Sequence, residues 1–196
     1  MDLATALGWL APRGWIRSPR ARPNALAAWH RPDYIAAVVQ AEKDGFVSDE
    51  VRARYHLGTH ANPVFPEMYR RPATAACAAI WAGEALQAEG VLYSPAGGTH
   101  HGLPDRANGF CYFNDPVLAI LSLREHGVRR IAYVDIDAHH PDGVEHAFRT
   151  DPDVLMLSVH EERRLSLIHI SEPTRPRLVS RMPSSAWRGG GGGGGG

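Results

Sequence analysis

The chain has 196 residues, enough for one domain with a hydrophobic core. Its 21 basic and 21 acidic residues balance, which argues against both a strongly basic nucleic-acid surface and an acidic tail. The 2 cysteines follow no secretory signal, and no apolar run approaches the ~20 residues that span a bilayer, so we expect a cytoplasmic protein without a membrane segment.

The first half of the chain reads mainly as helix. Helices are predicted over residues 1–10, 33–43 and 72–89. Gly45 and Gly90 follow the second and third of these, as expected for glycines that end helices. Residues 58–69 are rich in proline and asparagine and are predicted to form a loop.

The second half alternates between strand and helix. Strands are predicted over residues 91–94, 130–135 and 154–159, and helices over residues 115–125 and 142–148. Asn114 is a typical helix N-cap, and Pro116 suits the first turn. This spacing predicts βαβ units, and therefore an α/β fold with a parallel sheet and right-handed crossovers.

Acidic and histidine side chains follow the strand that ends near residue 135. Asp135, Asp137 and His139 alternate, so an extended backbone places them on one side, in the crevice where open α/β sheets bind ligands. Asp137 and His139 could supply two of the three protein ligands of a catalytic zinc ion. Alternatively, an aspartate caps the next helix and His139 and His140 are loop residues; this short pattern alone leaves both interpretations open.

A histidine pair follows the strand predicted at residues 91–94. His100 and His101 come after two glycines, which allow a sharp turn and a close approach to a ligand. Imidazoles titrate near neutral pH and suit proton transfer, and Asp135 and Asp142 could each orient one of them. A solvated loop is the alternative for this pair alone. Two such clusters one helix apart favour an active site.

Three segments carry a family resemblance, in the family's order and spacing. Residues 97–101 read Gly-Gly-Thr-His-His, residues 108–115 read Asn-Gly-Phe-Cys-Tyr-Phe-Asn-Asp, and residues 133–143 read Tyr-Val-Asp-Ile-Asp-Ala-His-His-Pro-Asp-Gly. Together with residues 62–69 and 155–160, they resemble the zinc-dependent histone deacetylase superfamily, in particular its bacterial acetoin-utilisation type. The resemblance covers about residues 3–164 and corresponds to the N-terminal half of the family's domain.

The resemblance implies a fold and a reaction. The fold is a three-layer parallel sheet flanked by helices, arginase/deacetylase-like and here incomplete. The reaction is removal of acetyl groups from acetyl-lysine, a polyamine or a small acylated amine by metal-activated water. His101 would be the general base and His100 its electrostatic partner, with Asp142 and Asp135 orienting them.

The resemblance also assigns ligand and substrate sites. Asp137 and His139 would bind Zn²⁺ or another divalent metal such as Fe²⁺. Gly109 and Phe110 would line the channel for the acylated side chain. A structural K⁺ or Na⁺ would bind at Asp135, Asp137, His139 and Ser158, partly through backbone carbonyls.

Some features depart from the family pattern. His60 and Ala61 stand at the substrate rim, where acidic residues are common, and Pro141 stands where glycine is usual. A further aspartate ligand and a transition-state-stabilising tyrosine come later in family sequences, so we expect the chain as written to be inactive. A metallophosphoesterase also uses Asp-x-His, but its Gly-Asn-His box is absent here. A non-catalytic or partner-completed binding domain is the remaining alternative.

The character of the sequence changes after Arg164. Residues 165–175 resemble the conceptual translation of a transposase adapter used in DNA library preparation, and residues 189–196 are all glycine. We therefore expect residues 1–164 to be a partial deacetylase domain and residues 165–196 to be a non-native, disordered tail that arose as a sequencing artefact. On this interpretation His169 is not a ligand. A flexible glycine-rich linker is the alternative.

Overall fold

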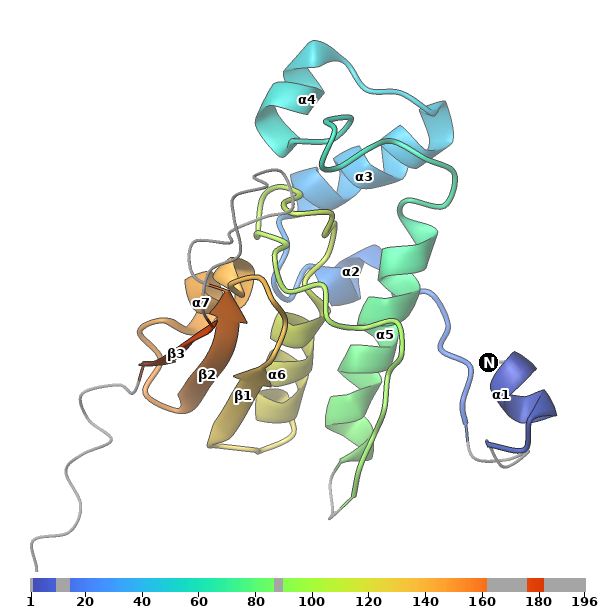
Figure 1. Cartoon of the computed structure of the whole chain (residues 1–196). Coiled ribbons are helices and arrows are strands. Elements are labelled where there is room, and N and C mark those ends of the chain that lie inside the picture. The colour runs from blue at the N-terminus through green and yellow to red at the C-terminus, as the bar shows by residue number, and fades with distance from the viewer. Residues whose placement is uncertain (1, 10–14, 87–89, 162–175, 182–196) are drawn as a thin grey trace, which may run out of the picture.

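The computed structural model describes residues 2–9, 15–86, 90–161 and 176–181 (Figure 1). The helices are α1 (Asp2–Ala6), α2 (Pro23–Leu26), α3 (Pro32–Asp44), α4 (Asp49–Tyr55), α5 (Arg70–Ala85), α6 (Asp115–Glu125) and α7 (Asp142–Phe148). The strands are β1 (Ile131–Asp135), β2 (Val154–Glu161) and β3 (Pro176–Arg181). Among the described helices, none is long and apolar enough to cross a bilayer.

Local signals in the sequence set several helix ends. Gly45 follows α3 in the left-handed conformation, with φ of 75°, so the predicted end of that helix is confirmed. The hydroxyl oxygen of Ser48 accepts the amide hydrogen of Val51 and caps α4. Asn114 caps α6 in the same way, as its position in the sequence predicts.

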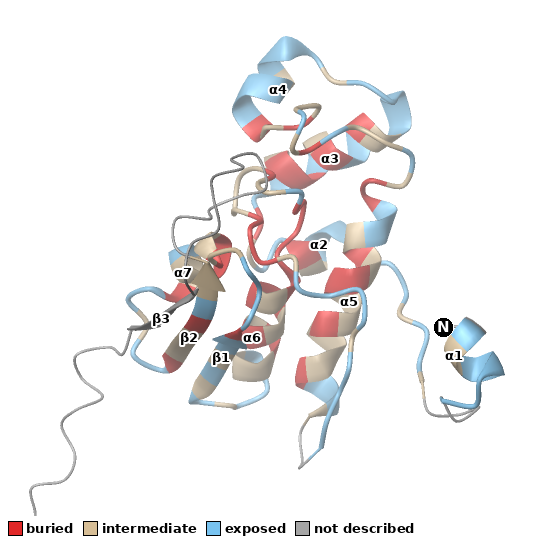
Figure 2. Cartoon of the chain, viewed as in Figure 1, coloured by how far each residue is buried: buried red, intermediate tan, exposed pale blue. Residues whose placement is uncertain are grey.

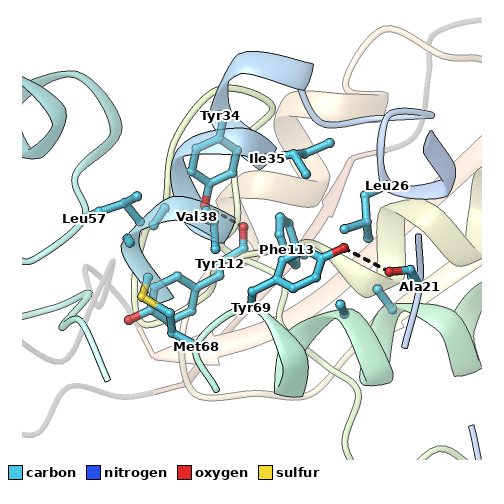
Figure 3. Packing of buried hydrophobic residues seen from close by; sticks show 14 of the residues in the cluster. Ala21, Leu26, Tyr34, Ile35, Val38, Leu57, Met68, Tyr69, Tyr112 and Phe113 are labelled. Atoms are coloured by element: carbon cyan, nitrogen blue, oxygen red, sulfur yellow. Dashed lines mark hydrogen bonds between the residues drawn. The ribbon is translucent and has the colours of Figure 1, made fainter. Parts of the chain in front are cut away.

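Aromatic rings form the centre of the larger core (Figure 3). Phe113 is fully buried, and its ring meets those of Tyr34 and Tyr69 edge to face. The hydroxyl of Tyr34 donates to the carbonyl oxygen of Tyr112 at 2.7 Å, and that of Tyr69 donates to the carbonyl of Ala21 at 3.0 Å. This core therefore fixes the loop that leads into α6 against α3 and the start of α5.

Helices α5 and α6 pack against each other at unusually close range. A Cβ atom on Gly83 of α5 would lie 2.1 Å from the hydroxyl oxygen of Ser122 in α6. The same hydroxyl donates to the carbonyl oxygen of Ile80 at 2.7 Å. Only glycine permits this approach, which ties the position of α6 to that of α5.

A parallel pair of strands forms the sheet expected from the sequence. β1 pairs with β2 in parallel, in a register that runs from Ile131 opposite Val154 to Asp135 opposite Ser158. Helix α7 connects the two strands, so the βαβ unit is β1–α7–β2. The carboxyl ends of both strands consequently lie at the same edge as Asp135.

Only one face of this strand pair is covered by described residues. α6 and α7 pack on the face that includes Val154, through a small core with Val144 and Phe148 (Figure 2). On β1 and directly after it, Val134 remains 62% exposed and Ile136 83% exposed. In the part of the chain that the structure describes, two of the three layers implied by the family resemblance are therefore present.

The prediction of a strand at residues 91–94 is wrong. These residues are described but belong to no strand, and Val91 and Tyr93 are 98% and 84% exposed. An apolar run becomes a strand only where a neighbouring strand completes its backbone hydrogen bonds. No described strand pairs with these residues, so the unit of residues 91–94, 115–125 and 130–135 does not form.

A strand also occurs where none was predicted. β3 pairs antiparallel with β2, from Met156 opposite Arg181 to Glu161 opposite Pro176. This strand lies inside the segment 165–196, which we expected to be disordered. For residues 176–181 that prediction is wrong, because they form a paired strand. A free strand edge is a template for any nearby extended segment, and this pairing occupies one edge of β2. The non-native origin of the tail stays a prediction.

The unequal burial of the two sheet faces gives a paired test. Val154→Ala should lower the free energy of unfolding by about 1.5–3 kcal/mol, because it removes buried methyl groups and leaves a cavity. Val134→Ala, the same substitution on the exposed face, should change it by less than about 0.5 kcal/mol. Urea unfolding of the two variants measures the difference, and equal losses would contradict the one-sided packing.

Candidate active site

Two adjacent, buried histidines stand at the centre of the candidate site. His100 and His101 are each 5% exposed. Nδ1 of His100 lies 2.7 Å from Oδ2 of Asp135, and Nδ1 of His101 lies 2.6 Å from Oδ1 of Asp142. The structure therefore brings together the four residues predicted to be catalytic, from a loop, the end of β1 and the start of α7.

The two imidazoles also meet each other. Nε2 of His100 lies 3.1 Å from Nε2 of His101. Because each Nδ1 faces a carboxylate, each carries the hydrogen there, and the contact between the Nε2 atoms needs one further hydrogen. The pair is thus arranged to hold a single mobile proton between two neighbouring rings.

The surroundings favour the charged state of the buried pair. Burial acts to lower the pKa of His100, but the hydrogen bond and charge of Asp135 outweigh it and raise that pKa. Burial acts to raise the pKa of Asp135, yet hydrogen bonds from His100, Tyr133 and the amide of Asp137 lower it to about 2. Asp135 is therefore ionised at neutral pH, and the protonated form of His100 is stabilised beside it.

The candidate metal ligands form a compact pair after β1. Oδ1 of Asp137 accepts the amide hydrogen of His139 at 2.7 Å and lies 2.8 Å from Nδ1 of the same residue. These bonds outweigh the effect of burial and lower the pKa of Asp137. The ring of His139 lies 5.9 Å from that of His101, centre to centre, so the pair adjoins the histidines.

The donor set suits zinc but is small. A carboxylate oxygen and an imidazole nitrogen are donors that zinc accepts, and Nε2 of His139 is buried without a hydrogen-bond partner. Within the described ranges, no group of three or more histidine, cysteine, aspartate or glutamate side chains is arranged to hold a metal ion. The residues present therefore fit part of a catalytic zinc site, which normally has three protein ligands.

The predicted monovalent-cation residues lie around the same strand ends. Ser158 is buried in β2, directly opposite Asp135 of β1 in the register. Its hydroxyl lies 2.8 Å from Nδ1 of His160. Asp137 and His139 follow β1 as described above. The strand pairing gathers these residues, and the cation itself stays a prediction.

Of the two residues predicted to line the channel, Gly109 lies directly against the ring of His101, and Phe110 follows it in the same turn. A Cβ atom on Gly109 would lie 2.7 Å from the ring of His101, and Gly109 has φ of 52°. Phe110 has φ of 65°, uncommon for a residue with a side chain, and its ring is partly exposed. Oδ1 of Asn62 accepts its amide hydrogen at 3.1 Å and holds this backbone in place.

Sequence reasoning missed two residues that complete the hydrogen bonding of the carboxylates. Nδ2 of Asn108 donates to Oδ2 of Asp142 at 2.7 Å, and the hydroxyl of Tyr133 donates to Asp135. Alternation along the strand could have identified Tyr133, two residues before Asp135. Pro141, the departure from the family pattern, does not prevent Asp142 from reaching His101.

Comparison with solved structures places this fold among the deacetylases. The crystal structure of a histone deacetylase homologue from Aquifex aeolicus matches with a TM-score of 0.76 and 37% identity, over 81% of this chain and 42% of that one. The same values hold for a histone deacetylase homologue complexed with SAHA. The fold is therefore that of the arginase/deacetylase class, as predicted.

Sequence comparison then defines the family. The model described as "Histone deacetylase domain" matches residues 2–166. Acetoin utilization protein AcuC of Bacillus subtilis is 39% identical over 77% of this chain and 40% of its own length; histone deacetylase 8 of Xenopus tropicalis is 35% identical over 82% and 43%. The chain belongs to the histone deacetylase family of hydrolases. It spans about two-fifths of the length of these relatives.

A buried histidine beside the site should make stability depend on pH. His30 accepts the amide hydrogen of Asn114 at Nε2 and donates from Nδ1 to the carbonyl oxygen of Leu103, each at 3.0 Å. Burial lowers its pKa from 6.5 to about 4. The unfolded chain therefore binds a proton that the folded chain excludes, and stability should fall as the pH drops from 6.5, by on the order of 3 kcal/mol at pH 4.

Two variants separate this effect from other titrations. His30→Gln should lose most of the difference in unfolding free energy between pH 7 and pH 4.5, measured with urea. His60→Gln, at an exposed position, should keep it. An unchanged pH dependence in His30→Gln would show that other groups are responsible.

Proposed function

We propose that the chain is the part of a zinc-dependent amidohydrolase that carries the proton-transfer pair and two metal ligands. The complete enzyme would remove acetyl groups from acetyl-lysine, a polyamine or a small acylated amine. The supporting observation is the pair of buried imidazoles, His100 and His101, each with its own carboxylate and with facing Nε2 atoms. This arrangement lies beside Asp137 and His139.

Asp137 and His139 are the residues that would hold the divalent metal, through a carboxylate oxygen and an imidazole nitrogen. When bound, Zn²⁺, or Fe²⁺ in its place, polarises the acetyl carbonyl and lowers the pKa of the attacking water. Two hydrogen bonds fix the loop that carries these donors: Oδ1 of Asp137 accepts the amide hydrogen of His139, and Oδ1 of Asp135 accepts that of Asp137. K⁺ or Na⁺ would be held by Asp135, Asp137, His139 and Ser158.

The histidines have distinct roles in this proposal. The ring of His101 lies 5.9 Å from that of the proposed metal ligand His139, which would place this imidazole beside the attacking water. His101 is therefore the general base, which takes a proton from water and returns it to the leaving amine nitrogen. Asp142 fixes its tautomer and stabilises the imidazolium, and His100 with Asp135 acts electrostatically.

The substrate would enter past the turn at Gly109 and Phe110. The partly exposed ring of Phe110 offers an apolar wall for the stem of an acylated amine, and Gly109 leaves room next to His101. His60 is exposed on the loop that Asn62 joins to this turn. An acidic residue at this rim could accept hydrogen bonds from the substrate, which a histidine in its cationic form cannot do. We therefore expect the substrate preference of this protein to differ from that of relatives with an acidic rim.

Metal binding tests the assignment of ligands. Two ligands should bind Zn²⁺ weakly, and Asp137→Ala or His139→Ala should lower the affinity about tenfold or more, about 1.4 kcal/mol. Competition against a chromophoric chelator measures the affinity. His60→Ala is the matched control, since it removes an exposed imidazole from the same protein. Equal affinities in all variants would show that zinc binds elsewhere.

The purified chain should not catalyse deacetylation. The described residues contain no group of three possible metal ligands. The family resemblance also implies a tyrosine that stabilises the transition state, and it places that tyrosine later in the sequence than the part of the family domain that this chain matches. Losing a single oxyanion donor typically lowers the rate about 10²–10³-fold. The measurement is hydrolysis of an acetyl-lysine peptide with and without a chelator, beside a full-length histone deacetylase. Chelator-sensitive hydrolysis by the chain alone would overturn this expectation.

A further inference from the structure

The first residues of α6 do more than begin the helix. Oδ1 of Asn114 accepts the amide hydrogen of Val117 at 3.1 Å, the ordinary bond of an N-cap. Its Nδ2 donates in the opposite direction, to the carbonyl oxygens of His100 at 3.1 Å and Gly102 at 3.0 Å. Aspartate or serine would cap the helix equally well, and neither could donate both of these bonds.

The next residue holds the other side of the same loop. The carboxylate of Asp115 accepts the amide hydrogens of Gly98 at 3.0 Å and Thr99 at 2.8 Å, and it also contacts the Thr99 hydroxyl. Asp115 is 5% exposed. Hydrogen bonds that a buried carboxylate accepts are stronger than hydrogen bonds between neutral groups. Two side chains in sequence thus bind the backbone before and after the histidine pair.

This loop has little rigidity of its own. Gly98 has φ of 95°, and the loop begins and ends with further glycines, Gly97 and Gly102. The backbone nevertheless fits closely between two helices. A Cβ atom on Gly97 would lie 2.6 Å from the Asp115 carboxylate, and one on Gly143 of α7 would lie 2.5 Å from the carbonyl oxygen of His100.

We propose that Asn114 and Asp115 are positioning residues, which hold the His100–His101 pair in its orientation before a metal ion or any further polypeptide is added. The inference deepens the proposed function, since it rests on the histidines as the proton-transfer pair. The bonds by which these two side chains hold the loop all lie within residues 98–115. Small displacements of a catalytic group cost large factors in rate, so a clamp on a glycine-rich loop has a direct chemical use.

The orientation of the pair has a spectroscopic signature that needs neither metal nor activity. An Nδ1 hydrogen that a buried imidazole donates to a carboxylate resonates far downfield of the amide protons and exchanges slowly. His100 and His101 each make such a bond, to Asp135 and Asp142. Proton NMR of the full chain with ¹⁵N-labelled histidine should therefore show two of these resonances without added zinc.

The decisive variant is Asn114→Asp, which keeps an N-cap oxygen but turns a carboxylate oxygen toward the carbonyls of His100 and Gly102. We expect both downfield resonances to be lost while circular dichroism still shows the folded helices. Asn114→Ser, which keeps a capping hydroxyl without the two donors, should give the same loss. Ser48→Ala removes the cap of α4, away from this site, and should leave both resonances in place.

Asp115→Asn tests the second half of the clamp, because it preserves shape and removes the charge that binds Gly98 and Thr99. It should also weaken or remove the resonances. Both resonances persisting in Asn114→Asp, or neither appearing in the unsubstituted chain, would overturn the proposal. Complete unfolding of both Asn114 variants would overturn it too, by showing a general structural role. A negative deacetylation assay would bear on the proposed function alone and leave these resonances unaffected.

Discussion

The hydrogen bond between His100 and Asp135 joins the two parts of the described structure. His100 belongs to a loop held by the helical part, whereas Asp135 ends β1 of the sheet. Both side chains are buried, and a buried carboxylate is costly unless its oxygens are satisfied. Asp135 meets this requirement with three donors, from His100, Tyr133 and the amide of Asp137. Any displacement of β1 relative to α6 would leave a charge without its partners.

The site was predictable because it depends on rules that act over short distances in sequence. Asp137 and His139 follow Asp135 within four residues, so they lie near the end of β1, and a parallel sheet puts its strand ends at one edge. The start of α6 at Asn114 and the end of α3 at Gly45 follow from capping chemistry in the same way. These features need no knowledge of distant parts of the chain.

Features that depend on a partner were not predictable. Residues 91–94 have the composition of a strand, but a strand forms only with a neighbour, and none of the described strands pairs with them. β3 is the converse case, in which a segment of unremarkable composition pairs because β2 offers a free edge. The sequence also shows Asn114 as a cap without revealing that its amide nitrogen binds the histidine loop, since that contact is tertiary.

The candidate active site has two parts, the histidine pair and the proposed metal ligands. The described residues complete the first part but not the second. Each histidine has its carboxylate, each carboxylate has a further donor in Tyr133 or Asn108, and the loop is held on both sides of the pair. The proposed metal ligands among the described residues, by contrast, number two, on a loop whose Asp137 is largely exposed. In the proposed mechanism, proton transfer depends on contacts local to residues 97–142, whereas tight metal binding requires a donor beyond Asp137 and His139. The proposed mechanism therefore allows the histidine pair to be oriented first, with metal binding completing a site whose proposed base is already in place.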